Sequence, residues 1–268
     1  MKLKVLVDNN TYIDEYYYGE PGVSYYIEDE GEKILFDVGY SGLYIKNAKK
    51  MGIDLNEIQK IVLSHAHDDH TGGLKYYFDN YKNKPEIIGC FGIFNEKKYN
   101  DLKISCPMEE VEILEKTKVI YSNTPKKITK NIIFLGEIPR KNNFENKIPL
   151  GKIKIEGRYM DDYNLDDSAL VYKSKKGIYI ITGCSHSGIC NIIEYAKNMY
   201  KDNRVLGIIG GFHLFDIDNQ LDETIKYLKK NKINENLYPC HCVSLKVKLE
   251  LGKYFKINEV GVGLELEW

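Results

Sequence analysis

The chain has 268 residues, with 38 lysines and arginines against 39 aspartates and glutamates, and a formal net charge of −1 at pH 7. This balance gives no basic excess that would favour nucleic acid or an acidic membrane surface, so we expect a small-molecule substrate. The length suits one domain over residues 1–268 with a substantial core, because no Pro-, Gly- or Ser-rich stretch divides the chain.

The cysteines and the apolar runs favour a cytoplasmic protein. The six cysteines are too dispersed for the disulfide framework of a small secreted protein. Residues 1–8 lack the features of a signal peptide, and no apolar run approaches the ~20 residues that a membrane helix needs. We therefore expect no membrane partner, while an oligomer is compatible with the sequence.

The first part of the chain predicts strands and one helix. Apolar runs bounded by turns predict strands over residues 3–7, 23–27 and 33–36, the last ending in Asp37. Apolar residues at helical spacing follow from Leu43 to Met51, and Gly52 is placed to cap that helix. A strand over residues 58–63 comes next. From 86 to 151 the pattern loosens, with strands predicted over 87–90, 111–114 and 132–135, and we expect this segment to cover the active face.

The second part of the chain alternates strands with helices. Residues 169–172 and 178–182 read as a hairpin, followed by a helix from 188 to about 200, a strand over 205–209, a helix around Ile225 and a strand over 237–239. Three of these strands are followed closely by a histidine, namely His186, His213 and His241. Side chains gathered at strand ends are how layered α/β proteins build a site on a rigid frame.

The densest group of polar residues lies just after the strand that ends at residue 63. His65, His67, Asp68, Asp69 and His70 fall within six consecutive positions. Alternate side chains of an extended segment point the same way, so His65 and His67 can grip one ion, while the following turn brings Asp69 and His70 toward a second. Imidazole and carboxylate donors suit Zn, Mn or Fe, and one or two such divalent ions, most naturally Zn, favour hydrolysis.

A lone histidine is more often a core residue than a ligand, but this clustering argues for a metal centre. His186 and His241 are further ligand candidates because each lies at a strand end. His213 fits a ligand or substrate contact as well as a structural hydrogen-bonding role. Cys184 is the one thiol expected near the centre, whereas Cys240 and Cys242 are predicted to be core residues because the neighbours of a strand residue point to the opposite face.

These motifs resemble the metallo-β-lactamase superfamily. The strand followed by His-x-His-x-Asp-His, with Asp37 upstream and His186 and His241 downstream, carries the resemblance. Further segments resemble the branch named after 7,8-dihydropterin-6-methyl-4-(β-D-ribofuranosyl)aminobenzene 5'-phosphate synthase, and the similarity covers nearly the whole chain. They are Gly-Glu-Ile-Pro-Arg at 136–140, Asp-Asp-Ser-Ala-Leu at 166–170, Gly-Cys-Ser-His at 183–186, Gly-Gly-Phe-His-Leu at 210–214 and Pro-Cys-His-Cys at 239–242.

The resemblance implies a four-layer αββα sandwich of α/β class, with the metal site along one edge of two face-to-face sheets. It implies a first metal site of His65, His67 and His186, a second of Asp69, His70 and His241, and a supporting Asp37 that orients a ligand histidine. The chain departs from the usual pattern in two ways. Asp166 or Asp167 stands nearest the position of a superfamily histidine, so His186 substitutes from another strand. The strand that usually carries a bridging aspartate reads Thr182-Gly183-Cys184.

The expected activity is that of a metallohydrolase acting on a small phosphorylated or ester-like metabolite. A metal-bound hydroxide would attack, with Asp69 as the catalytic residue that orients it or accepts its proton. Arg140 and His213 are the predicted substrate contacts, Arg140 through its planar guanidinium. The main alternative is a transferase of the pterin synthase type, which displaces pyrophosphate. A third reading is a metal- or redox-sensing binding protein, suggested by Cys184 and the Cys-His-Cys segment.

Overall fold

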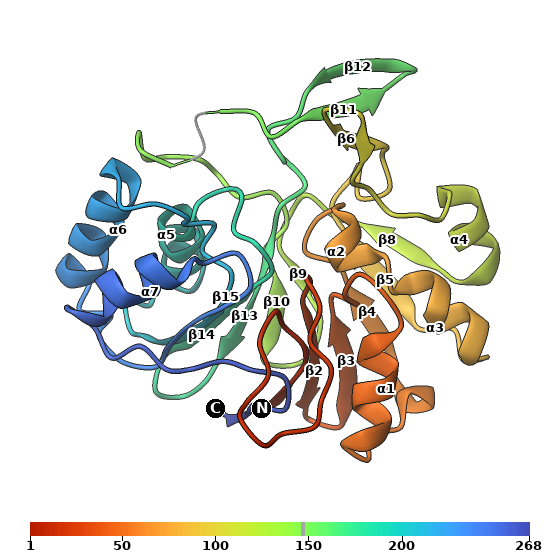
Figure 1. Cartoon of the computed structure of the whole chain (residues 1–268), viewed down its shortest axis with the longest axis horizontal. Coiled ribbons are helices and arrows are strands. Elements are labelled where there is room, and N and C mark those ends of the chain that lie inside the picture. Colours follow the sequence, from red (N-terminus) through yellow and green to blue (C-terminus); the bar gives the residue numbers. More distant parts are fainter. Residues whose placement is uncertain (146–147) are drawn as a thin grey trace.

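A computed structural model describes residues 1–145 and 148–268, and in these ranges the strands form three sheets (Figure 1). The first sheet has the order β17 (Glu265–Glu267), β1 (Lys2–Val7), β2 (Ser24–Asp29), β3 (Glu32–Phe36), β4 (Lys60–Val62), β5 (Glu86–Gly89) and β8 (Val119–Tyr121). The second has the order β16 (Leu237–Pro239), β15 (Val205–Gly210), β14 (Ile178–Thr182), β13 (Ala169–Lys173), β10 (Ile132–Phe134) and β9 (Lys126–Lys127). The third, which we call the flap sheet, has the order β12 (Arg158–Asp161), β11 (Lys152–Ile155), β6 (Lys97–Tyr99) and β7 (Leu102–Lys103).

Helices cover the outer faces of the first two sheets, which makes four layers (Figure 1). On the first sheet lie α1 (Leu43–Lys50), the 3-10 helix η1 (Leu55–Glu57), α2 (Asp68–Thr71), α3 (Leu74–Asn80) and α4 (Glu110–Lys116). On the second lie α5 (Ile189–Tyr200), α6 (Asn219–Lys230) and α7 (Leu245–Gly252). The flap sheet stands apart from both, beyond α2 at the top of the view.

The layers follow from the alternation of apolar side chains along the strands. In β3, Ile34 and Phe36 enter the core between the two sheets, whereas Leu35 packs beneath the helices of the first sheet. In β14, Ile181 joins the core between the sheets and Ile180 packs beneath α5 and α6. Because successive side chains of a strand point to opposite faces, strands that are apolar on both faces must be covered on both. The sequence therefore dictates a buried sandwich.

The direction of the strands decides where the site forms. β3, β4 and β5 are parallel neighbours in the first sheet, and β14, β15 and β16 are parallel neighbours in the second. Parallel strands end at the same edge of a sheet, so the residues that follow them lie close together. Asp37, the segment from His65 to His70, Cys184, His213 and His241 all follow the ends of these strands.

Most predicted elements are confirmed, and one is wrong. The strands predicted over 3–7, 23–27, 33–36, 58–63, 87–90, 132–135, 169–172, 178–182, 205–209 and 237–239 each overlap a strand, and the helices before Gly52, after 188 and around Ile225 are present. Residues 111–114 belong to α4 instead of a strand. Glu109 and Glu112 form a capping box that starts this helix, a signal that the apolar run obscured.

The segment expected to cover the active face does contribute to the flap sheet, through β6 and β7. The hairpin of β11 and β12, which completes that sheet, was not predicted. Residues 146–147, within the expected covering segment, lie outside the described residues. No helix in the described ranges has the length and apolarity needed to span a membrane.

Candidate metal centre

Three histidines converge at the strand ends in what we call the first donor group. It consists of His65, His67 and His186. The Nε2 atom of His65 lies 3.0 Å from His67 Nδ1 and 3.2 Å from His186 Nε2, and all three side chains are buried. The loop after β4 supplies the first two, and the loop after β14 supplies the third. The structure thus brings together the three residues that the sequence analysis placed in the first site.

A second donor group lies beside the first and contains one residue that the predicted ligand set lacked. It consists of Asp69, His70, Cys184 and His241. His70 Nε2 lies 3.2 Å from both Cys184 Sγ and His241 Nε2, and 3.4 Å from Asp69 Oδ2. Cys184 thus occupies the strand position at which the superfamily pattern usually has a bridging aspartate. The two groups meet where the His65 and His70 rings are in contact, at a ring-centroid distance of 4.2 Å and an interplanar angle of 54°.

The spacing of these atoms fits divalent metal ions. Nitrogen ligands about 2.05 Å from a tetrahedral zinc ion lie roughly 3.3 Å apart, and a thiolate ligand lies slightly farther from the metal. The distances from His65 Nε2 to His67 and His186 are of this size, so the first group could hold one ion with three imidazoles. The second group has the spacing of a carboxylate, a thiolate and two imidazoles. Histidine, aspartate and cysteine in these arrangements can hold a metal ion.

Asp37 and Ser64 hold two of the rings from behind. Asp37 Oδ2 accepts a hydrogen bond from His70 Nδ1 at 2.7 Å and another from Ser64 Oγ at 2.7 Å. Because Ser64 Oγ donates to Asp37, it accepts from His65 Nδ1, which lies 2.9 Å away. Both rings therefore carry their proton on Nδ1 and present Nε2 to the donor groups. This is the position expected for the supporting Asp37.

The N-terminal segment holds His241 in the same way. His241 Nδ1 lies 3.1 Å from Asn9 Oδ1, and Asp8 Oδ2 accepts a hydrogen bond from the backbone N–H of His241 at 2.9 Å. Donation from Nδ1 to Asn9 leaves Nε2 free to face the second donor group. Residues at opposite ends of the chain thus define this ligand.

Gly183 allows the two sheets to approach closely behind the site. A Cβ atom at this position would lie 2.2 Å from Ser64 Oγ and 2.9 Å from Asp37 Oδ2. Any larger residue would displace the two groups that orient His65 and His70. The Thr-Gly-Cys strand end therefore needs its glycine for packing.

The strand ends turn through the left-handed region of backbone conformation. Asp37, Ser185, His213 and His241 have φ values of 57°, 62°, 50° and 53°. Non-glycine residues in this region cost on the order of 1–3 kcal/mol each where the surroundings force them, and they gather at functional sites. These four residues lie directly beside the two donor groups, so the backbone conformation there is held by the surrounding contacts.

Burial and neighbouring charges push the pKa values of the two groups in opposite directions. In the first group, burial lowers the pKa of His67 to about 3 and holds the pKa values of His65 and His186 well below their usual range. In the second, burial alone would lower the pKa of His70, but the carboxylates of Asp69 and Asp37 raise it well above its usual range. In metal-free protein the first group is therefore a set of neutral imidazoles, whereas the second pairs the His70 imidazolium with the Asp69 carboxylate. A bound ion would take the place of the proton on His70 Nε2.

Two aspartates near the position of the usual superfamily histidine have structural contacts in place of a metal contact. Asp166 Oδ2 accepts a hydrogen bond from the backbone N–H of Ala66 at 2.7 Å, and Asp167 Oδ2 accepts one from that of Ser187 at 2.8 Å. Each carboxylate therefore ties a ligand-bearing loop, one on either side of the first group. Neither belongs to the described clusters that could hold an ion.

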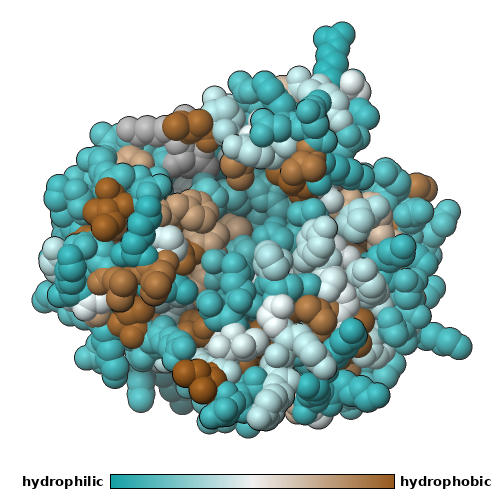
Figure 2. All heavy atoms as spheres, in the orientation of Figure 1, coloured by the Kyte–Doolittle hydropathy of each residue, from teal (hydrophilic) through white to brown (hydrophobic). Residues whose placement is uncertain are grey.

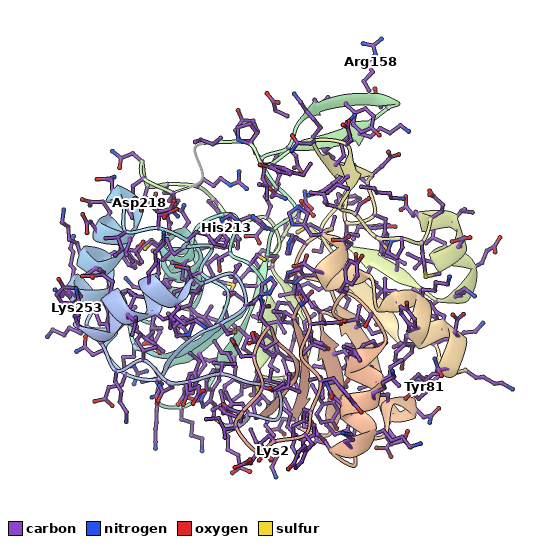
Figure 3. All side chains as sticks on the ribbon, viewed as in Figure 1. Lys2, Tyr81, Arg158, His213, Asp218 and Lys253 are labelled. Carbon is purple, nitrogen blue, oxygen red and sulfur yellow. The ribbon has the colours of Figure 1, made fainter. Side chains whose placement is uncertain are left out.

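A cavity of about 460 Å³ adjoins the first donor group. His186 and His213 line it, opposite a wall formed by Phe144 and residues 148–150, and the first residues of α6 close one side. The His213 ring contacts the His186 ring at a ring-centroid distance of 4.4 Å, and burial lowers the pKa of His213 to about 4. In Figure 3 the labelled His213 lies toward the middle of the molecule, in contrast to Arg158 at the tip of the flap sheet. Figure 2 shows a hollow on this face, hydrophilic at its centre and with apolar patches beside it.

Arg140 lies behind the site and is not among the residues that line the cavity. Its Nη2 donates to the backbone oxygen of Asn164 at 2.8 Å, which places the guanidinium on the loop that carries Asp166 and Asp167. Contact with a substrate therefore stays a prediction for this residue, whereas His213 has the position that such a contact requires.

Two residues of this region were not anticipated from the sequence. Lys97 is completely buried, and its ammonium contacts Asp162 and Asp166. Asn164 lies beside the ligand His67. A lysine among many lysines and an asparagine in an irregular loop give no sequence signal of such placement.

Cys240 and Cys242, on either side of His241, differ in their burial. Cys240 is buried in the core between the sheets and contacts the hydroxyl of Tyr25 at 3.2 Å, as predicted. Cys242 is only partly buried, and its thiol donates to the backbone oxygen of Cys184 at 3.4 Å. The prediction that it is a core residue is wrong, because the chain turns at His241 and does not continue as a strand.

The fold and the site define an αββα protein built around two adjacent donor groups. The model of the metallo-beta-lactamase superfamily matches residues 17–89. Two proteins of Methanocaldococcus jannaschii are similar along the chain. One, named uncharacterized protein MJ0448, is 34% identical over 94% of each chain. The other, named 7,8-dihydropterin-6-methyl-4-(beta-D-ribofuranosyl)-aminobenzene-5'-phosphate synthase, is 31% identical over 96% of this chain and 92% of its own.

Solved structures agree with this assignment. The crystal structure of Tm1679, described as a metal-dependent hydrolase of the beta-lactamase superfamily, has a TM-score of 0.86 and 28% identity, covering 100% of this chain and 99% of its own. The chain belongs to the metallo-β-lactamase superfamily. The αββα sandwich expected from the sequence is confirmed.

Proposed function

We propose that the protein is a metal-dependent hydrolase that acts on a small phosphorylated or ester-like metabolite. The observation that carries the proposal is the pair of adjacent donor groups, which touch through the rings of His65 and His70, with a cavity beside the first. His65, His67 and His186 would hold one ion, and Asp69, His70, Cys184 and His241 a second, with zinc favoured by the thiolate. When bound, such ions lower the pKa of a coordinated water and polarise the oxygen of the group under attack.

The chain's own residues have the following roles in this proposal. Asp69 is partly exposed, and its Oδ2 lies 3.2 Å from His241 Nε2, so its carboxylate can orient the attacking water and accept its proton. The substrate would occupy the cavity, with His213 in contact with it. Asp37 and Ser64 keep the ligand rings in the required tautomers.

A second candidate function is a transferase of the pterin synthase type. The similarity to the M. jannaschii synthase favours it, because the alignment extends over nearly the whole of both chains. The same donor groups would then serve to bind and orient a pyrophosphate leaving group, and water would have to be excluded from the cavity.

One experiment tests the proposal and separates the two candidates. Protein purified without chelator is assayed for metal equivalents by inductively coupled plasma mass spectrometry. It is then incubated with p-nitrophenyl phosphate, bis-p-nitrophenyl phosphate and p-nitrophenyl acetate, and separately with a dihydropterin pyrophosphate and a ribofuranosylaminobenzene phosphate. About two metal equivalents with hydrolysis of any ester supports the hydrolase. Condensation of the pterin pair without hydrolysis supports the transferase, and absence of bound metal refutes the proposed centre.

A further inference from the structure

The loop of residues 162–167, which we call the aspartate loop, connects the flap sheet to the first donor group. On one side the buried ammonium of Lys97, from β6, lies 2.6 Å from Asp166 Oδ1 and 3.0 Å from Asp162 Oδ2. On the other side Asp166 Oδ2 accepts from the backbone N–H of Ala66, which stands between two ligand histidines. A lysine of the flap sheet and the backbone of the metal motif therefore share one carboxylate.

The same loop reaches His67 directly. Asp162 Oδ1 accepts a hydrogen bond from the backbone N–H of Asn164 at 2.8 Å. The side-chain Nδ2 of Asn164, which is buried, lies 3.2 Å from His67 Nε2. Arg140 donates to the backbone oxygen of Asn164 from behind. Contacts to both the backbone N–H and the backbone oxygen of Asn164 thus hold its side-chain amide against the ring.

The chemistry of His67 defines what this amide must do. His67 differs from the other ligand histidines for which a partner behind the ring was described, because its Nδ1 faces the donor group and its Nε2 faces away. A ligand nitrogen needs a free lone pair, so the proton must sit on Nε2, and the partner of Nε2 must be an acceptor. A half-turn of the Asn164 amide presents its oxygen to that proton.

We propose that Lys97, acting through the aspartate loop, is a positioning residue that holds the Asn164 amide oxygen on His67 Nε2–H and so directs the Nδ1 lone pair of His67 into the first donor group. The inference rests on the proposed function for the identity of the donor group as a metal site. Asn164 is in direct contact with the ring, and the buried ammonium of Lys97 joins Asp162 and Asp166, which lie at the two ends of the segment that carries Asn164.

The flap sheet is coupled to the site by this arrangement. The backbone N–H of Asp68 donates to the oxygen of Ile104, which follows β7, and His67 forms an isolated bridge with Ser105. Lys97 lies on the neighbouring strand, since Lys98 pairs with Lys103. Displacement of the flap sheet would therefore act on His67 through its backbone and through its ring at once.

The test compares four variants of the full-length protein. Asn164→Gly removes the amide and tolerates the left-handed φ of 50° at this position, whereas Asn164→Asp keeps an acceptor. Lys97→Met removes the buried charge. Lys98→Met makes the same change at the adjacent, partly exposed lysine and serves as the matched control. In metal-free protein, long-range proton–nitrogen NMR correlation reports which nitrogen of His67 is protonated.

The expected result is an Nε2–H tautomer for His67 in the wild type, in Asn164→Asp and in Lys98→Met, and a mixture of tautomers in Asn164→Gly and Lys97→Met. Chelator competition measures the affinity of each zinc equivalent separately, and loss of an equivalent in His67→Ala identifies the one bound at the first donor group. The affinity for that equivalent should fall roughly 10- to 100-fold in Asn164→Gly. It should stay near the wild-type value in Asn164→Asp.

An unchanged tautomer and unchanged zinc affinity in Asn164→Gly would overturn the proposal. Should Lys97→Met fail to fold, the two Asn164 variants still decide the role of the amide, and Lys97→Arg, which restores the charge, decides that of the lysine. A wild type that binds no zinc would refute the metal centre, but the tautomer of His67 would still report on the positioning.

Discussion

The two donor groups lie side by side but differ in almost every physical property. The first, of three buried imidazoles, offers no negative charge to a cation. The second offers a carboxylate and a thiol as well as two imidazoles, and Asp37 adds a further carboxylate behind His70. A bound cation is therefore offset in charge only at the second group. We therefore expect a divalent ion to bind more firmly at the second group than at the first.

Removal of a ligand from the first group should have the largest effect. We expect His67→Ala to abolish hydrolytic activity, by at least about 1,000-fold, because both the ion and its orientation are lost. About one metal equivalent should disappear while far-ultraviolet circular dichroism stays native. The measurement is activity together with metal content, and a fully active variant would remove the first group from the site.

Exchange of the thiol should change the metal preference of the second group. Cys184→Asp replaces a soft donor by a hard one, so we expect zinc affinity at this group to fall about tenfold or more relative to manganese affinity. Cys242→Ser, next to it but outside the donor group, is the matched control and should leave the ratio unchanged. Competition between the two metals, followed by mass spectrometry, measures the ratio. Equal ratios in all three proteins would mean that Cys184 is not a ligand.

The opposite pKa shifts of the two groups predict opposite responses to acid in metal-free protein. His67 has its pKa lowered to about 3, so the unfolded chain binds its proton between pH 6.5 and 3 while the folded chain does not. The free energy of unfolding should therefore decrease as the pH is lowered through this window, by up to about 1.4 kcal/mol per pH unit for one proton. The pKa of His70 is raised, so its contribution is present below pH 6.5 and is lost as pH rises.

Urea unfolding between pH 4 and pH 7.5, with a chelator present, measures these slopes. His67→Asn should reduce the loss of stability below pH 6.5. His70→Asn should leave that loss unchanged, but it should remove the gain in stability that His70 gives as the pH falls from 7.5 to 6.5. Identical slopes in both variants would contradict the charge difference between the two groups.

The smallest effect is expected at Arg140, which lies outside both groups. If Arg140 contacts the substrate, the Arg140→Ala variant should have a Michaelis constant raised by a few-fold with little change in turnover. If Arg140 instead supports the aspartate loop through its contact with Asn164, the variant should have a lower metal affinity at the first group. Steady-state kinetics and zinc titration of the same variant distinguish the two roles.

All three residues of the first group were predicted from the sequence, whereas the second group was predicted without Cys184. His65 and His67 alternate along an extended segment, so their convergence follows from geometry alone. Cys184 could not be assigned because its approach depends on how closely the two sheets pack at Gly183. The sandwich followed from apolar alternation, whereas the flap sheet did not, since its strands are short and β12 is fully exposed. Lys97 and Asn164 acquire their roles only through tertiary contacts.

The order of the donors along the chain has a consequence for truncation. All donors of the first group precede residue 187, whereas the second group includes His241, which the Asp8–Asn9 segment holds in place. The second group is therefore complete only when residues from near both ends of the polypeptide meet, and loss of either end would remove a donor or its support.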